Sequence, residues 1–150
     1  MARDDERRLD AAAAWRAAQK RAGSNVLGWK LDRAERAALI GRLPPVYGHV
    51  DADHVTLAAR VGDGLALPAE TEGAIVGRAD DGDGVEAMVV RIAGATDRPD
   101  GSTYHVTWSL DRAKGRRPVE SNDVIRAHGW TPIEPPVPIA LIPTLWGRRR

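Results

Sequence analysis

Cysteine and phenylalanine are both absent from this chain of 150 residues. Without cysteine, the protein can form neither a disulfide bond nor a thiolate metal site. The sequence also lacks a glycine-rich phosphate loop, and no apolar run approaches the roughly 20 residues that a membrane-spanning helix needs. Residues 1–8 are charged where a secretion signal would turn apolar. We therefore expect a soluble, cytoplasmic protein.

An excess of one sign of charge is missing too, because the formal net charge is only +1. This balance argues against a surface that binds nucleic acid everywhere. Basic side chains nevertheless gather in two places, at Arg112, Lys114, Arg116 and Arg117 and at residues 148–150. Local clusters of this kind can hold a phosphate group even when the total charge is balanced. The length fits one compact domain with its own hydrophobic core.

Alanine and charged residues dominate residues 3–22, and this composition favours a helix. The Gly-Ser-Asn sequence at residues 23–25 ends the pattern. We therefore expect residues 1–30 to form an N-terminal helical extension, followed by a single domain over residues 31–150. One hypothesis for the helix is a partner-binding role, since it lies outside the motifs described below.

A second helix is expected over residues 32–43. Asp32 and Glu35 have the spacing of a capping box, with Asp in place of Ser or Thr. Apolar residues then recur at helical spacing until Pro44 and Pro45 end the helix.

Beyond these prolines the apolar residues recur with a period of two, which predicts β-strands. The expected strands cover residues 54–61, 73–79, 85–93, 103–110 and 136–141. Residues 80–84 would join two of them as a hairpin, and Ser121 could cap a short helix through residue 128. Pro138 suggests that the last strand lies at a sheet edge or ends there. Helices mixed with antiparallel strands predict the α+β fold class.

The sequence His-Val-Thr occurs twice, at residues 54–56 and at residues 105–107, each time within an expected strand. Residues i and i+2 of a strand point to the same face. Each strand therefore offers one imidazole and one hydroxyl to a common surface, while the valine and the next apolar residue can enter a core. The candidate catalytic residues are His54, Thr56, His105 and Thr107.

A phosphodiester suits two histidines and two threonines that share a cleft. Hydrolysis needs a base that deprotonates water and an acid that protonates the departing oxygen. Histidine titrates near neutral pH, so a pair can hold one neutral and one protonated member. The hydroxyls can donate to the non-bridging phosphate oxygens, and the scheme needs no metal. A single His-x-Thr in a strand is more often structural, whereas two copies with matching apolar neighbours are less easily accidental.

The paired motifs resemble the signature of the two-histidine phosphoesterase superfamily, which is a pair of His-x-Thr/Ser-apolar sequences. Within it, the chain is most similar to the cyclic phosphodiesterase modules of tRNA ligases and RNA-repair proteins. The resemblance covers about residues 32–142. Besides the motifs, residues 44–47, 103–110 and 116–123 carry it.

The resemblance implies a bilobal fold, in which two antiparallel sheets form a central cleft and each carries one motif. It implies a metal-independent and cofactor-free phosphodiesterase that hydrolyses 2′,3′-cyclic phosphate ends of RNA or nucleotides to 2′-phosphates. His54 and His105 would be the acid and the base, in either order, and Thr56 and Thr107 would hold the phosphate. The short separation of the two motifs implies a small first lobe without a long substrate-binding insertion.

Five further residues are candidates for substrate binding. They are Tyr47, Lys114, Arg116, Arg117 and Ser121. The three cations could clamp the phosphate or the RNA backbone, Tyr47 could stack on a base, and Ser121 could contact phosphate. For any one cation a solvated turn is the favoured alternative, and a helix cap explains Ser121 equally well.

Four aromatic residues are assigned to packing instead. By strand alternation Tyr104 and Trp108 are expected in the core, and Trp130 and Trp146 are expected to anchor the core or the lobes. Two other functions stay open at this point. The same cleft could bind RNA ends or nucleotides without turnover, or it could hydrolyse linear 2′-5′ bonds.

Overall fold

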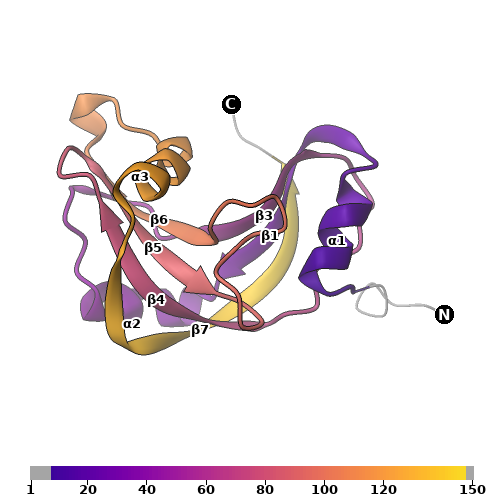
Figure 1. Cartoon of the computed structure of the whole chain (residues 1–150), viewed down its shortest axis with the longest axis horizontal. Coiled ribbons are helices and arrows are strands. Elements are labelled where there is room, and N and C mark those ends of the chain that lie inside the picture. Colours follow the sequence, from indigo (N-terminus) through magenta and orange to yellow (C-terminus); the bar gives the residue numbers. More distant parts are fainter. Residues whose placement is uncertain (1–7, 148–150) are drawn as a thin grey trace.

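The computed structural model describes residues 8–147 and has the expected α+β class (Figure 1). Its elements are α1 (Ala11–Ala18), β1 (Ala22–Leu31), α2 (Arg33–Arg42), β2 (His49–Val50), β3 (His54–Val61), β4 (Glu72–Asp80), β5 (Val85–Arg91), β6 (His105–Leu110), the 3-10 turns η2 (Arg112–Lys114) and η3 (Pro118–Glu120), α3 (Ser121–His128) and β7 (Thr131–Gly147). Within the described residues, no helix is long and apolar enough to cross a membrane.

The seven strands form one curled antiparallel sheet in the order β2-β6-β5-β4-β7-β1-β3. The resemblance implied two separate sheets, and the difference lies in β7, a long curved strand that passes from β4 to β1 (Figure 1). Residues 131–140 of β7 pair with β4, whereas residues 141–147 pair with β1. A single strand therefore joins both halves of the sheet.

The prolines of β7 explain why only residues 136–141 were expected to be a strand. A proline has no N–H to donate, so it interrupts the sequence signal of a strand. In the sheet, residues 131–140 have β4 as their strand neighbour on one side, and no described strand pairs with them on the other. Pro138 pairs opposite Ala74 in this segment, so its edge placement is confirmed locally although β7 is not an edge strand overall.

The remaining elements follow the sequence pattern closely. Strands β3, β4, β5 and β6 lie within two residues of the expected ranges, and α2 and α3 do as well. Asp32 caps α2 as expected, since its carboxylate accepts a hydrogen bond from the Ala34 amide at 2.9 Å. Glu35 does not complete the capping box, because its carboxylate accepts instead from the amide of Ala140 at 2.8 Å.

The N-terminal extension over residues 1–30 is wrong as a structural unit. The only helix within the described part of this range is α1. Residues 1–7 lie outside the described residues, and residues 8–10 precede the helix. Residues 22–31 form β1, which pairs with β3 on one side and β7 on the other. The helix-favouring composition ends at residues 23–25, and the pairing surface of two neighbouring strands then decides the conformation of the residues that follow.

The two ends of the sheet order meet because β2 and β3 are consecutive in the chain. After β2 pairs with β6, the amides of Asp51 and Ala52 still donate to the carbonyls of Trp108 and Thr107, each at 2.9 Å. Ala52 has a φ of 46°, in the left-handed region that non-glycine residues rarely adopt. The chain then turns into β3, which pairs with β1. We call residues 51–53 the seam.

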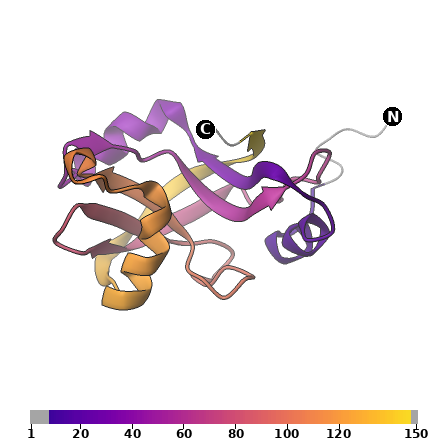
Figure 2. The ribbon, with the colours of Figure 1, turned by 90° about the horizontal axis from the view of Figure 1, so that it is seen from above.

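The hydrophobic core fills the inside of this curl and continues under the helices. Trp29 and Trp108 are its largest fully buried side chains, and their indole N–H groups donate to the carbonyls of Glu70 and Leu43 at 2.9 and 2.8 Å. Tyr104 packs edge-on against Trp29, so the expected core positions of Tyr104 and Trp108 are confirmed. Helices α1 and α3 lie at opposite ends of the sheet (Figure 2).

We expect Ile139→Ala to lower the free energy of unfolding by about 2–4 kcal/mol, because Ile139 is 3 % exposed and its removal leaves a cavity in the core. Ile142→Ala is the matched control on the same strand. Its side chain is 46 % exposed, so we expect a loss below about 1 kcal/mol. Denaturant unfolding of both variants checks this, and equal losses would contradict the assigned faces of β7.

Candidate active site

Both His-Val-Thr motifs begin a strand, as His54 is the first residue of β3 and His105 the first of β6. The central valines, Val55 and Val106, are fully buried in the core inside the curl. Because successive side chains alternate, each histidine and its threonine point away from that core to the outer face. The expected core positions of the two valines are therefore confirmed, and each histidine lies on the opposite face of its strand.

The seam brings the two motifs together. Strands β3 and β6 are in contact, although they are far apart in the order of the sheet. Ala52 is hydrogen-bonded to Thr107, and His54 follows two residues later. His54 therefore lies near the first residues of β6, the end of that strand at which His105 stands. Both side chains point to the outer face.

His54 is oriented by its sequence neighbour Asp53. The Asp53 carboxylate lies 2.9 Å from His54 Nδ1 and 2.7 Å from Lys30 Nζ, and it also accepts a hydrogen bond from Arg33. These bonds, the one from His54 foremost, hold the pKa of the Asp53 carboxyl well below its usual range despite partial burial. An ionised Asp53 fixes the proton of His54 on Nδ1, which leaves Nε2 for a substrate.

His105 is oriented by the backbone. Its Nδ1 donates to the carbonyl of Thr103 at 2.9 Å, so Nε2 carries the free lone pair of the neutral ring. Burial, opposed by the hydrogen bond to Thr103 and assisted by the charges of Arg98 and His54, lowers the pKa of His105 to about 4. At neutral pH His105 is therefore uncharged.

The two threonine hydroxyls differ. Thr56 Oγ1 has no hydrogen-bond partner within residues 8–147, and its side chain is partly exposed. Thr107 is only 8 % exposed, and its Oγ1 lies 2.8 Å from Ser121 Oγ and 3.3 Å from the carbonyl of Pro118. Ser121 is fully buried and uses its hydroxyl in this contact rather than to cap α3, whose N-cap residue is Glu120.

Three residues beside His54 were not expected in the site. Lys30 lies opposite His54 in the β1–β3 register, and Arg33 reaches Asp53 from α2. The Trp146 ring stands edge-on to the His54 imidazole with 5.0 Å between centroids, and Lys30 Nζ lies 4.4 Å from the centroid of the same ring. Trp146 is therefore a partly exposed neighbour of His54 rather than a core anchor. Asp53, the sequence neighbour of His54, was not expected in the site either.

Four of the five expected substrate-binding residues lie toward the other end of β6. Tyr47 donates from its amide to Ser109 Oγ and from its hydroxyl to Asp80. His105 and Ser109 are four positions apart on one strand, which corresponds to about 14 Å. Tyr47 therefore does not lie beside the histidines.

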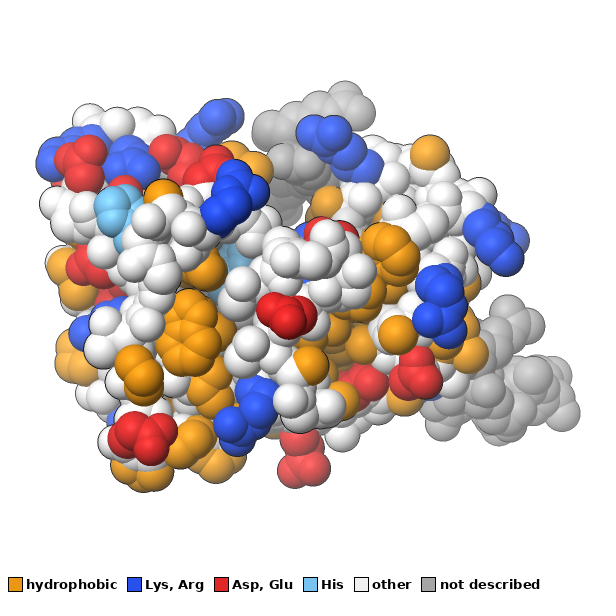
Figure 3. Space-filling model, in the orientation of Figure 1, with side chains coloured by type: hydrophobic (Ala, Val, Ile, Leu, Met, Phe, Trp, Pro, Cys, Tyr) orange, Lys and Arg blue, Asp and Glu red, His pale blue; other side chains and the backbone are white. Residues whose placement is uncertain are grey.

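The cations that follow β6 are paired with acidic side chains at this end. Lys114 Nζ lies 2.9 Å from Asp83, and Arg116 lies 2.8 Å from Asp81 and 3.0 Å from Glu120. Basic and acidic side chains are correspondingly intermixed over the end of the molecule at the upper left of Figure 3. Arg117 is exposed in the same segment. The structure does not bring these cations to the imidazoles.

The pKa of His105 predicts how stability depends on pH. The unfolded chain takes up a proton on this residue near pH 6.5, whereas the folded chain does so only near pH 4. The free energy of unfolding should therefore fall as the pH drops through this window, by at most about 3 kcal/mol. The lowered pKa of Asp53 acts at lower pH, below its usual value of 3.8.

The test is to compare denaturant unfolding between pH 4 and 7 for the wild type, His105→Gln and His128→Gln. Removing His105 should flatten the dependence on pH, because no proton uptake then differs between the two states at this position. His128 is exposed, so its variant should keep the wild-type slope. An unchanged slope in His105→Gln would contradict the buried neutral imidazole.

The site as described contains imidazoles, hydroxyls, a carboxylate and a lysine. Within residues 8–147, no three His, Asp or Glu side chains gather in a group that could hold a metal ion. No protein-family model, no curated protein and no solved structure matches this chain. The chemistry of the site is therefore argued from its own side chains.

Proposed function

We propose that this chain is a metal-independent phosphodiesterase that opens 2′,3′-cyclic phosphate ends of RNA or nucleotides to 2′-phosphates. The observation that carries the proposal is that the strands of the two motifs are in contact and that each histidine has its Nδ1 engaged, with no hydrogen-bond partner for Nε2 among residues 8–147. An acid and a base directed at one phosphate are what hydrolysis of a phosphodiester needs.

The environments of the two histidines favour His105 as the base and His54 as the acid. The neutral His105 accepts a proton from water through Nε2, and the hydroxide oxygen forms a bond to phosphorus. The bond from phosphorus to O3′ breaks, and O3′ takes a proton from Nε2 of protonated His54. The Asp53 carboxylate, 2.9 Å from Nδ1, holds that ring in place through a hydrogen bond. One water is consumed, and proton exchange with solvent restores both rings.

The negative charge that builds on the phosphate has two donors near His54. Thr56 lies on the same face of β3 as His54, and its hydroxyl has no partner in the described part of the chain. Lys30 offers an ammonium group beside Trp146. Donors placed where charge develops stabilise the transition state more than the ground state. Thr107, held by Ser121, positions β6 against α3 in this scheme.

Strand β7 pairs with β4 along its first part and with β1 along its second part, so the single sheet has two halves. We take these halves to correspond to the two lobes that the resemblance implies. Residues 141–147 of β7 with β1 and β3 form one half, which carries His54. Residues 131–140 with β4, β5, β6 and β2 form the other half, which carries His105. In this proposal the two halves act as the two lobes, and the substrate phosphate lies where they meet at the seam.

His54→Ala and His105→Ala should each lower kcat for 2′,3′-cyclic AMP at least about 100-fold, because each removes a proton-transfer group. The assay is phosphate-position analysis of the product in the presence of chelator. His128→Ala is the control, since this exposed histidine lies outside both motifs. Retained activity in both motif variants would refute the assigned site.

The pH profile distinguishes the role of His105 from that of an ordinary histidine base. The base must be unprotonated, and burial lowers the pKa of His105 to about 4. The acid limb of kcat/KM should therefore fall through pH about 4 rather than about 6.5. Rates measured between pH 3.5 and 8 with stability checked at each pH test this, and a limb centred near 6.5 would assign the base elsewhere.

A binding module without turnover is the second candidate. It is favoured by Thr107, whose hydroxyl is buried against Ser121 and so is not free to hold a phosphate. Measured affinity for RNA ends without product from cyclic or 2′-5′ substrates would support it. Product from linear 2′-5′ dinucleotides alone would instead identify a 2′-5′ phosphodiesterase.

A further inference from the structure

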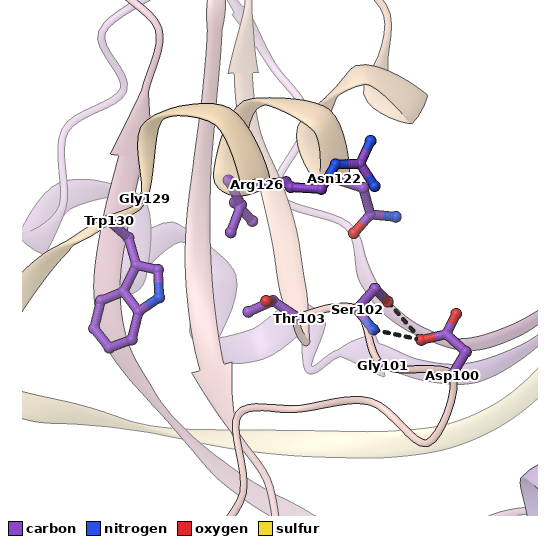
Figure 4. Close-up of a pocket in the computed structure, with 9 residues that line it drawn as sticks. Asp100, Gly101, Ser102, Thr103, Asn122, Arg126, Gly129 and Trp130 are labelled. Atoms are coloured by element: carbon purple, nitrogen blue, oxygen red, sulfur yellow. Dashed lines mark hydrogen bonds between the residues drawn. The ribbon is translucent and has the colours of Figure 1, made fainter.

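A cavity of about 400 Å³ opens between α3 and the loop that precedes β6 (Figure 4). Ser102 and Thr103 line it from the loop, Asn122 and Arg126 line it from α3, and Trp130 closes one side. None of these residues belongs to the two motifs. The volume is within the range of pockets that hold small organic ligands.

Trp130 provides an aromatic wall whose position depends on a glycine. A Cβ atom at Gly77 on β4 would lie 2.0 Å from Cε3 of the Trp130 ring, so the indole rests directly on the strand backbone. Trp130 is still 39 % exposed. An indole supported in this way and open on its remaining surface is a platform on which a flat ring can stack.

Asn122 supplies a polar group without a partner. Its Oδ1 atom is buried, and no described residue donates a hydrogen bond to it. A buried acceptor in that state costs free energy, and a rotation of the Asn122 amide that turns Oδ1 toward the cavity would let a ligand N–H group recover it. In Figure 4 the amide of Asn122 lies near the loop wall, while Trp130 stands on the opposite side of the opening. An amide side chain can both donate to and accept from the edge of a nucleobase.

Both walls of the cavity are tied to the second motif. The carbonyl of Thr103 accepts the hydrogen bond from His105 Nδ1 at 2.9 Å. On the other wall, Ser121, the neighbour of Asn122, has its hydroxyl 2.8 Å from Thr107 Oγ1. Residues that line or adjoin both walls of the cavity are therefore hydrogen-bonded to His105 and Thr107 of that motif.

We propose that this cavity binds the nucleobase of the substrate, stacked on Trp130 with its polar edge toward Asn122. The inference rests on the proposed phosphodiesterase function, and it supplies the base recognition that the two motifs by themselves lack. The sugar then leads from the cavity past Thr103 to a phosphate at His105.

The test measures binding separately from turnover. Calorimetry gives the Kd of adenosine 2′-monophosphate, the proposed type of product, and of inorganic phosphate, which has no base. Trp130→Ala should raise the Kd of the nucleotide about tenfold and leave that of phosphate unchanged, because only the nucleotide loses a stacked ring. Gly77→Ala should have a similar effect, since the added methyl displaces the indole without removing it.

Two controls separate stacking from general damage. Trp130→Tyr keeps an aromatic face and should restore most of the nucleotide affinity. Val119→Ala alters a side chain that is 59 % exposed on η3, outside the cavity, and should bind both ligands as the wild type does. Thermal unfolding checks that each variant is folded.

The outcomes of the two proposals can be told apart. Unchanged nucleotide affinity in a folded Trp130→Ala variant overturns the base site, even if the wild type hydrolyses cyclic phosphates. Nucleotide binding that depends on Trp130 in a wild type without hydrolysis supports the base site and refutes the phosphodiesterase. An equal loss of affinity for nucleotide and phosphate also overturns the base site, because it indicates damage at the phosphate position.

Discussion

The hydrogen bonds of the seam are the constraint on which the site depends. The amides of Asp51 and Ala52 bond to β6, and the chain then leaves for β1 as β3. Without these bonds, β3 and β6 would lie at opposite ends of an open sheet, and their histidines would not share a surface. Ala52 is fully buried and adopts a left-handed conformation, so the turn is held by its surroundings at some backbone cost.

Core and site are two faces of the same strands. Val55 and Val106 fill the inside of the curl, which orients His54 and His105 outward. The two histidines nevertheless have different surroundings. His54 stands next to an ionised carboxylate and a partly buried lysine, whereas His105 is partly buried and bonded to a backbone carbonyl. This asymmetry separates a candidate acid from a candidate base among two otherwise identical motifs.

The sequence predicted correctly those features that depend on neighbouring residues in the chain. The four motif residues were assigned to the outer face from alternation alone, and most strands were predicted within two residues of their observed bounds. It failed where contacts between segments far apart in the sequence determine the environment of a residue. Lys114 and Arg116 are basic in the sequence, but the hairpin of β4 and β5 neutralises them with Asp83 and Asp81. Lys30 had no signal at all, since its place beside His54 comes from strand register.

The sequence by itself determined the fold class and the faces of the two motif strands, because side-chain direction in a strand depends only on a period of two. Only the tertiary structure decided that the strands of the two motifs come into contact, that residues 22–31 are a strand of the sheet, and that Trp130 borders a cavity. Those facts depend on pairing between segments far apart in the chain. Such pairing is selected by burial of the whole core, which no local pattern of residues encodes.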